Sequence, residues 1–117
     1  MNRPAAFNTS LYRRNKYRNR WTDYAGAKYA SAKEAKFAAE LDLLVRAGEI
    51  ASWRRQCRIP LVVNGVTVTT YVVDFEIRHN DGTVEFVEVK GHPTPEWKLK
   101  WRLFDALRPE VRKRVVG

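Results

Sequence analysis

Residues 66–90 read VTVTT YVVDF EIRHN DGTVE FVEVK, and this stretch decides the fold. Two runs rich in β-branched and apolar residues, 66–77 and 84–90, flank the sequence NDG at 80–82, which is typical of a β-hairpin turn. Both faces of the first run are apolar before Asp74, which predicts a strand covered on both sides. The stretch therefore predicts two antiparallel strands joined by a tight turn.

The loop type decides whether the acidic residues of these two strands meet. If residues 80–82 form a three-residue loop with a left-handed glycine, Asp74 lies directly opposite Glu88, and Val72 lies opposite Lys90. Directly opposed Cβ atoms are about 4.5–5.5 Å apart. A two-residue Asp-Gly loop would put the two carboxylates on opposite faces. A site that uses both carboxylates therefore requires the three-residue loop.

The remaining elements complete an α+β pattern. In chain order we predict a short strand or turn at 24–30 and then a helix capped by Ser31 and ending near Ala47. A strand at 56–63, with a turn at Asn64-Gly65, precedes the two strands above. A helix capped by Thr94 and ending near Leu107 follows them, and a short last strand is predicted at 111–116. A helix, a three-stranded antiparallel meander, a helix and a last strand fit one domain over residues 21–117.

Charge is distributed unevenly along the chain. The net charge of +9 divides into +7 over residues 1–33, −3 over 34–89 and +5 over 90–117. Basic flanks are either a solvated surface or a binding surface for a polyanion such as nucleic acid. An acidic centre in a phosphate-binding protein needs a reason of its own, and a bound divalent metal is one.

The first twenty residues are a basic N-terminal arm without an acidic residue. Aromatic and cationic side chains alternate in it, which suits an arm that is disordered alone and orders on nucleic acid. A plain solvated tail is the alternative. The predicted nucleic-acid-binding residues are Arg13, Arg14, Lys16, Arg18, Arg20, Lys28 and Lys100.

The sequence also bounds the cellular setting. A single cysteine, Cys57, excludes an internal disulfide and favours a reducing compartment. The N-terminus lacks the apolar region of a signal peptide, and no apolar run reaches transmembrane length. We therefore expect an intracellular, cytoplasmic protein without a membrane partner.

Asp74 and Glu88 would repel each other at the distance expected for opposed residues. In a partly buried site such a pair is costly unless a countercharge arrives. Mg²⁺ fits, because it takes one or two carboxylates together with water and substrate phosphate. Lys90 points into the same site and could orient water or stabilise a phosphate. The alternative is a structural salt bridge of Lys90 with either carboxylate.

Two further charged residues have two readings each. Glu34 lies in the middle of the apolar face of the first helix, where it could aim at the sheet, although a capping box with Ser31 explains it equally well. Lys100 falls inside the apolar arc of the second helix. It either snorkels to solvent or reaches towards the phosphate to be cleaved.

These residues resemble a known family. Asp74, thirteen intervening residues and then Glu88-Val89-Lys90 look like the motif of PD-(D/E)XK nucleases, with Val73 in place of the leading proline. The wider pattern is similar to a phage-encoded branch of that clan, a domain of unknown function related to Holliday-junction resolvases and phage endonuclease I. The likeness runs from about Lys16 to Leu107, through Ser31–Glu34, Ala47–Ile50, Arg55-Gln56, Val73–Phe75, Glu88–Gly91 and Thr94.

The resemblance implies a restriction-endonuclease-like core and a Mg²⁺-dependent DNA endonuclease, in which Mn²⁺ substitutes for Mg²⁺. Asp74 and Glu88 would bind the metal together with the main-chain carbonyl of Val89. Lys90 would position or activate the attacking water. Glu34 would complete the site, and Gln56 would support it.

Substrate and assembly follow from the family alone. The resemblance implies structure-directed cleavage of branched or four-way DNA by a homodimer that is phage-encoded and acts in a bacterial host. The alternatives are a nicking or repair endonuclease on linear duplex, and a non-catalytic nucleic-acid-binding module whose carboxylates only make ion pairs.

Overall fold

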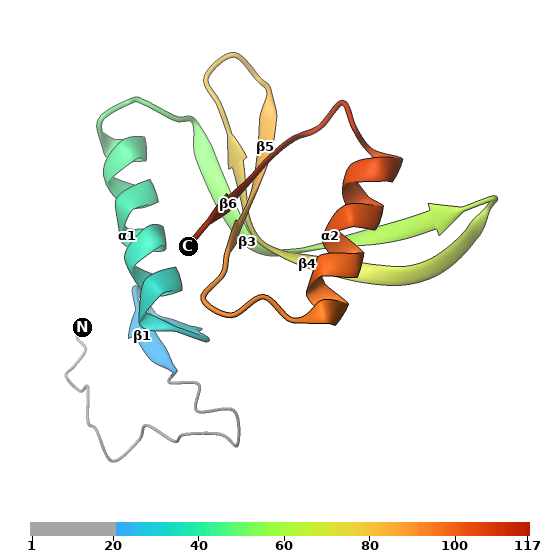
Figure 1. The fold of residues 1–117 in the computed structure, drawn as a ribbon. Helices are drawn as coiled ribbons and strands as arrows, with labels where there is room; N and C mark the ends of the chain where they lie inside the picture. The colour runs from blue at the N-terminus through green and yellow to red at the C-terminus, as the bar shows by residue number, and fades with distance from the viewer. Residues whose placement is uncertain (1–20) are drawn as a thin grey trace. The chain divides into compact units, whose positions relative to one another are not determined.

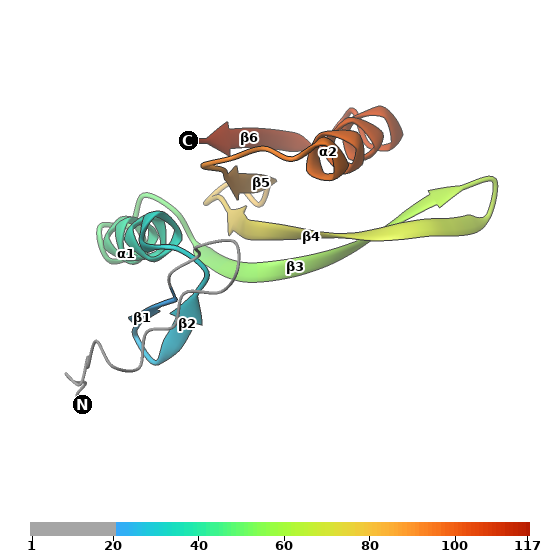
Figure 2. The ribbon, with the colours of Figure 1, turned by 60° about the horizontal axis from the view of Figure 1, so that its bottom comes forward.

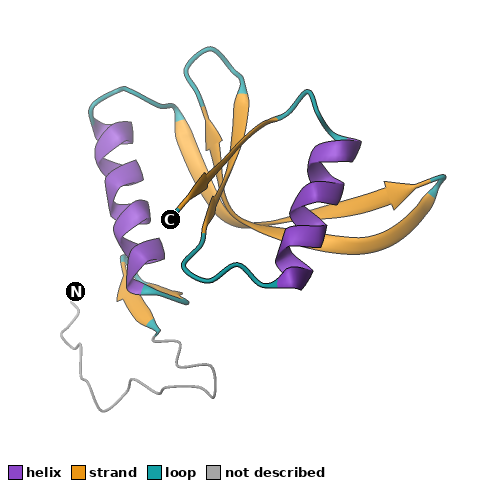
Figure 3. Cartoon of the chain, in the orientation of Figure 1, coloured by secondary structure: helices purple, strands orange, loops and turns teal. Residues whose placement is uncertain are grey.

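The computed structural model describes residues 21–117, which form two compact units, one ending at Leu44 and the other running from Val45 to Gly117. Two helices and two sheets confirm the predicted α+β class (Figure 1, Figure 3). Neither helix of these residues is long and apolar enough to cross a membrane. The elements are β1 (Thr22–Tyr24), β2 (Ala27–Tyr29), α1 (Ala32–Arg46), β3 (Ser52–Val63), β4 (Val66–Arg78), β5 (Val84–Val89), α2 (Pro95–Leu107) and β6 (Arg112–Val116).

The first unit is a short hairpin followed by α1. The hairpin turns at Ala25 and Gly26, both with positive φ, so that β1 pairs with β2. The N-cap prediction is confirmed, because Ser31 Oγ accepts a hydrogen bond from the main-chain N–H of Glu34 at 3.1 Å. The hydroxyl of Tyr24 donates to the carboxylate of Asp42 and ties the hairpin to the helix.

The second unit is built on a four-stranded sheet in the order β3-β4-β5-β6. The first three strands form the predicted antiparallel meander, and β6 pairs with β5 in parallel. The last strand can run parallel because α2 makes the crossover between β5 and β6. The chain between Val84 and Val116 is therefore a β-α-β unit attached to a hairpin.

The turn between β4 and β5 is the three-residue loop that the site requires. His79 N–H donates to Thr83 O at 2.8 Å, and Gly82 has φ +89°, in the left-handed region. The observed register pairs Phe75 with Val87, which is the pairing that a three-residue loop at 80–82 gives. A loop of this length keeps Asp74 and Glu88 on one face of the two strands, so the prediction is confirmed.

The hairpin of β3 and β4 is longer than β5, and its outer part runs on alone. The β4–β5 ladder covers only Phe75 to Arg78, whereas β3 pairs with β4 as far as Val63 and Val66. Figure 2 shows this hairpin extending well past β5 and β6. The prediction that β4 is covered on both sides before Asp74 is therefore wrong, because the strand outruns its neighbour and Val66 is exposed.

The α2 helix covers one face of the hairpin and sheet. Thr94 caps it as predicted, accepting from Trp97 N–H at 3.1 Å. Its buried Phe104 packs with ring centroids 5.7 Å from both Tyr71 and Phe86. The same cluster contains Leu61. This packing holds the first turn of α2 beside the point where β4 and β5 part.

Candidate functional site

The strands β4 and β5 part at the position of Asp74. The last pair of their ladder joins Phe75 to Val87. The carboxylate of Asp74 then accepts a hydrogen bond from the main-chain N–H of Val89, with Oδ2 and N 2.8 Å apart. Asp74 lies beside the end of β5, as predicted. It contacts β5 through its side chain, however, and not through a further main-chain pair of the ladder.

Lys90 is held by β6 and has no ladder partner in β4. Its main-chain N–H donates to the carbonyl of Val116 at 2.8 Å, which continues the parallel β5–β6 pairing. The predicted pairing of Val72 with Lys90 is therefore wrong, since β5 has already left β4. The ammonium group of Lys90 lies 3.4 Å from Glu88 Oε2 and 5.1 Å from the ring centroid of Trp97.

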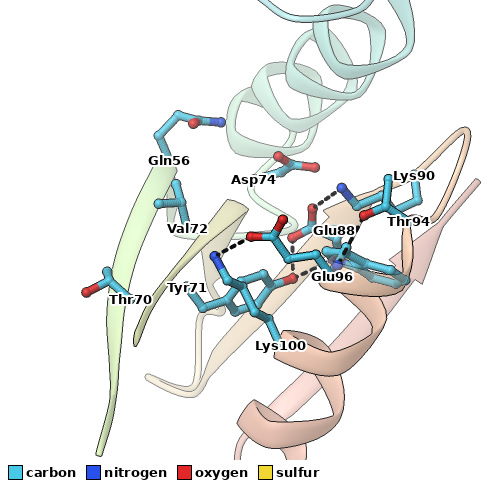
Figure 4. Close-up of a pocket in the computed structure, with 11 residues that line it drawn as sticks. Gln56, Thr70, Tyr71, Val72, Asp74, Glu88, Lys90, Thr94, Glu96 and Lys100 are labelled. Atoms are coloured by element: carbon cyan, nitrogen blue, oxygen red, sulfur yellow. Dashed lines mark hydrogen bonds and ion pairs between the residues drawn. The ribbon is translucent and has the colours of Figure 1, made fainter. Parts of the chain in front are cut away.

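A pocket of about 270 Å³ lies where the strands part and α2 begins (Figure 4). It brings together the three residues of the predicted motif, with side chains of β3 and α2 around them. Apart from the threonines, its wall is mostly aromatic, charged or amide side chains. The lining residues are Gln56, Thr70, Tyr71, Val72, Asp74, Glu88, Lys90, Thr94, Glu96, Trp97 and Lys100.

Glu88 is fixed by a chain of hydrogen bonds from two aromatic residues. Its side chain is only 2% exposed, and Oε1 accepts from the hydroxyl of Tyr71 at 2.6 Å. The Tyr71 oxygen in turn accepts from Trp97 Nε1–H at 2.9 Å. Burial raises the pKa of Tyr71, so the hydroxyl stays protonated and donates. Neither aromatic residue is among the site residues predicted from the sequence, because both belong to apolar stretches there.

The two carboxyl groups share one poorly solvated place. Burial, followed by repulsion from Asp74, raises the pKa of Glu88 to about 7. Burial also raises the pKa of Asp74, against the hydrogen bond from Val89 and the charge of Lys90. The charge of Lys90 does not offset the cost of placing a buried and a half-buried anion side by side. At neutral pH the pair therefore favours either a retained proton or an added cation.

The donor set suits a hard divalent cation that keeps part of its water. Within residues 21–117 no group of three or more His, Cys, Asp or Glu side chains forms a metal site. A cation at Asp74 and Glu88 would take its other ligands from main-chain oxygen, water or a phosphate. Mg²⁺ binds in this manner, with one or two carboxylates, whereas a closed all-protein cage is typical of other metals.

Gln56 has a strained main chain beside the site. Its φ is +54°, in the left-handed region that non-glycine residues seldom adopt. The β3–β4 ladder passes from the pair Arg55–Phe75 to the pair Cys57–Val73 and has no pair at Gln56. Strain of this kind concentrates at functional sites. The structure therefore places Gln56 in the pocket wall next to Asp74, with its support role still a prediction.

Lys100 stands at the other side of the pocket, on the second turn of α2. Its ammonium group lies 3.4 Å from Glu96 Oε2, one helical turn away, and its side chain is largely buried. The pair presents one cation and one anion to the pocket. Lys100 is therefore placed where a phosphate in the pocket would meet it, although the ion pair with Glu96 would have to open.

Other predicted residues are not among those that line this pocket. Glu34 belongs to the first unit, where its N–H completes the helix cap, and its catalytic role stays a prediction. Lys28 is exposed in β2, across the hairpin from Asp23. The predicted nucleic-acid contacts of the N-terminal arm lie outside the described residues: Arg13, Arg14, Lys16, Arg18 and Arg20.

Comparison with known proteins gives a family for the chain and no individual relative. No curated protein and no solved structure matches it. One family model, described as a protein of unknown function, DUF1064, matches residues 14–116 and so includes the whole pocket. The chain belongs to the DUF1064 family.

Proposed function

We propose that this protein is a metal-dependent DNA endonuclease that hydrolyses phosphodiester bonds at the pocket of Asp74, Glu88 and Lys90. The observation that carries the proposal is the buried carboxyl group of Glu88 beside the half-buried carboxyl group of Asp74, both with a raised pKa. Two such groups at a pocket that also presents lysines are suited to a cation and a phosphate together. The spacing of Asp74 and Glu88-Val89-Lys90, which resembles the PD-(D/E)XK motif, points the same way.

Asp74 and Glu88 would hold Mg²⁺, helped by the carbonyl of Val89, and Mn²⁺ would substitute. The metal would supply Lewis-acid stabilisation of the phosphate oxygens and a water of lowered pKa. Tyr71 fixes the orientation of the Glu88 carboxylate through a short hydrogen bond. An ordered ligand of this kind costs less reorganisation when the cation binds.

Lys90 would serve the attacking water. Its ammonium group is held between Glu88 and the ring of Trp97, and its main chain is fixed to β6. With a cation on Glu88, the lysine would be released from the ion pair and could face water or the pentavalent phosphate. Lys100 would offer a second positive charge to the phosphate group.

DNA is the substrate class that the charge pattern favours. The chain carries +7 before residue 34 and +5 from residue 90 on, so cations flank the acidic centre on both sides in sequence. Phosphate contacts by such cations give affinity without base specificity. We infer a structure-directed enzyme for branched or four-way DNA, acting inside the cell as a homodimer that cuts two strands symmetrically.

One observation favours a rival function. Lys90 and Glu88 form an ion pair at 3.4 Å, as they would in a non-catalytic nucleic-acid-binding module. A nicking or repair endonuclease on linear duplex is a second rival. Cleavage of a labelled four-way junction and of a matched linear duplex, each with Mg²⁺ or with EDTA, separates the three.

The experiment includes Asp74→Asn and, as a matched control, Asp81→Asn in the exposed turn. Asp81 uses one oxygen to accept from Thr83, which asparagine also provides. We expect the junction to be cut only with Mg²⁺ and only by the wild type and the control. In EDTA, Asp74→Asn should bind DNA more tightly than the wild type, because a repulsive charge is gone.

Two outcomes would contradict these proposals. Equal cutting of the linear duplex would favour the nicking or repair enzyme over a junction resolvase. Cleavage of neither substrate, with binding intact and unchanged by Asp74→Asn, would overturn the nuclease proposal and leave the binding module.

A further inference from the structure

The outer part of the β3–β4 hairpin is a two-stranded ribbon, defined here as residues 58–72. Its base is the pair of Arg58 and Val72, and its tip is the turn at Asn64-Gly65, both with positive φ. Among the described residues, β5 reaches β4 only as far as Phe75, so the ribbon has no third strand. An isolated two-stranded ribbon is at best marginally stable in water.

The base of the ribbon packs against α2, whereas its tip is exposed. Leu61 and Tyr71 are buried in the cluster around Phe104 of α2. Towards the tip, apolar side chains face solvent on both strands. The exposed fractions are 43% for Val62, 62% for Val66 and 58% for Val68. Exposed valines at the tip of a ribbon that has no third strand are typical of an association surface.

The ribbon is also the least charged part of a strongly charged chain. The fifteen residues from Ile59 to Val73 contain no Asp, Glu, Lys or Arg, which is the longest such stretch in the sequence. Elements that dock on DNA gain affinity mainly from cations that contact phosphates. Apart from Arg58 at its base, the ribbon lacks this source of affinity, so a protein surface is the better partner.

A second copy of the chain fits that requirement. Each copy carries a net charge of +9, so two copies repel each other over most of their surface. Beyond Arg58 the ribbon carries no charged residue and it exposes three valines, so the repulsion is weak there and apolar side chains are available for contact. Two identical apolar ribbons related by a twofold axis are self-complementary, because each residue meets its equivalent or its reciprocal partner.

We propose that the ribbon is the dimerisation surface, in which the valines around the tip of one copy pack against those of another. A dimer is part of the proposed function, but this surface is argued from the ribbon itself and does not depend on catalysis. It would hold two pockets in one particle, each at the base of a ribbon that contributes Thr70 and Val72 to its wall.

The test uses charge at the tip. In one variant Val66 and Val68 both become aspartate, and in a second both become lysine. Each should be a monomer by sedimentation at concentrations where the wild type is a dimer, with the dimer Kd raised roughly 100-fold by like charges placed face to face. Mixing the two variants should restore a dimer, since the charges are then opposite. Restoration also shows that both variants are folded.

Leu99→Asp is the matched control, because Leu99 is equally apolar, 66% exposed and on α2 away from the ribbon. It should leave the dimer unchanged. A monomeric wild type, ribbon variants that stay dimeric, or a mixture that stays monomeric would each overturn the proposal. So would a monomeric wild type whose binding to a four-way junction in EDTA is lost in the aspartate variant, because the ribbon would then serve DNA.

The sedimentation experiments are done without metal and do not depend on DNA cleavage. Failure of the dimer proposal is therefore read from sedimentation, whereas failure of the nuclease proposal is read from DNA cut by the wild type with Mg²⁺. Each result stands whatever the other shows.

Discussion

Glu85 and Glu88 lie three residues apart on β5 and are almost equally buried, yet their ionisation is shifted in opposite directions. Glu85 is 7% exposed and Glu88 is 2% exposed. Around Glu85, His79 and Arg114 each lie 2.9 Å from a carboxylate oxygen. Around Glu88, the nearest charged groups are the carboxylate of Asp74 and the ammonium of Lys90.

The difference shows that burial alone does not decide the charge of a carboxyl group. Burial opposes the ionisation of both glutamates, but His79 and Arg114 outweigh it and lower the pKa of Glu85. At Glu88, burial and Asp74 act together and raise the pKa to about 7. Cationic side chains therefore stabilise the charge of Glu85, whereas burial and Asp74 both oppose the charge of Glu88.

The largest expected effect is on catalysis. Glu88→Gln should lower cleavage of the preferred DNA by roughly 1,000-fold, because a metal ligand and its charge are lost. Glu85→Gln, three residues away, should keep wild-type cleavage at a temperature where both variants are folded. The measurement is a single-turnover rate with Mg²⁺. Equal losses in both variants would show that the contrast between the two glutamates has no catalytic meaning.

The pH dependence of stability should carry the second largest effect. Because the folded pKa of Glu88 lies above its ordinary value of 4.5, the folded state holds this proton more tightly than the unfolded chain. The free energy of unfolding that Glu88 contributes is therefore fully present at low pH. It should fall by on the order of 2 kcal/mol as the pH rises from about 4.5 to about 7. Glu85 acts in the opposite sense, and its contribution is lost as the pH falls below its ordinary value.

Urea denaturation in EDTA between pH 5 and 8 measures this slope. In Asp74→Asn the slope should be smaller but not absent, because burial, the larger cause, remains. Added Mg²⁺ should stabilise the wild type more at pH 8 than at pH 5, where it must compete with protons. A wild-type stability that rises steadily over this range would contradict the assignment.

A smaller effect is expected at the hydroxyl that orients Glu88. Tyr71→Phe keeps the ring against Phe104 and removes the donor to Glu88 Oε1. Loss of such a supporting hydrogen bond should weaken Mn²⁺ binding by roughly 10-fold, as seen by calorimetry. Trp97→Phe should have a weaker effect in the same direction, since it removes only the bond to Tyr71. Unchanged affinity in Tyr71→Phe would restrict this residue to packing.

The smallest effect is expected at the satisfied carboxylate. Glu85→Gln removes a charge whose partners Arg112 and Arg114 are about half exposed and can be solvated. We expect a loss of about 1 kcal/mol in the free energy of unfolding at pH 7. Glu88→Gln, measured in EDTA at the same pH, should cost less than this or increase stability. A larger loss of stability in Glu88→Gln than in Glu85→Gln would contradict the inference that Glu85 has more countercharge around it than Glu88.

The sequence was sufficient to predict the turn, the strand register and the helix caps, because local rules govern them. The NDG turn allows few conformations, and the left-handed Gly82 sets a register that brings Asp74 to the end of β5. The helix caps at Ser31 and Thr94 were predictable for the same reason, since a hydroxyl and an N–H three residues on are enough.

The full lining of the pocket and the exposure of the ribbon could not be predicted from the sequence, because they depend on where neighbouring strands end relative to one another. Alternation places Tyr71 and Asp74 on opposite faces of β4, yet both line one pocket, because β5 has left the edge of the strand there. The two strands of the ribbon were predicted at 56–63 and 66–77, but the exposure of its tip was missed for a similar reason. An apolar strand covered on both sides and an apolar strand that projects alone have the same residue pattern, as Val66 and Val68 illustrate.

Two neighbouring amide protons at the end of β5 differ in what they touch. The N–H of Val89 donates to the carboxylate of Asp74, whereas the N–H of Lys90 donates to the main-chain carbonyl of Val116. In a ¹⁵N-correlated spectrum the Val89 resonance should therefore move when Asp74 gains a proton or a cation. The Lys90 resonance supplies a reference one residue away, so the protein contains its own paired probe for occupancy of the pocket.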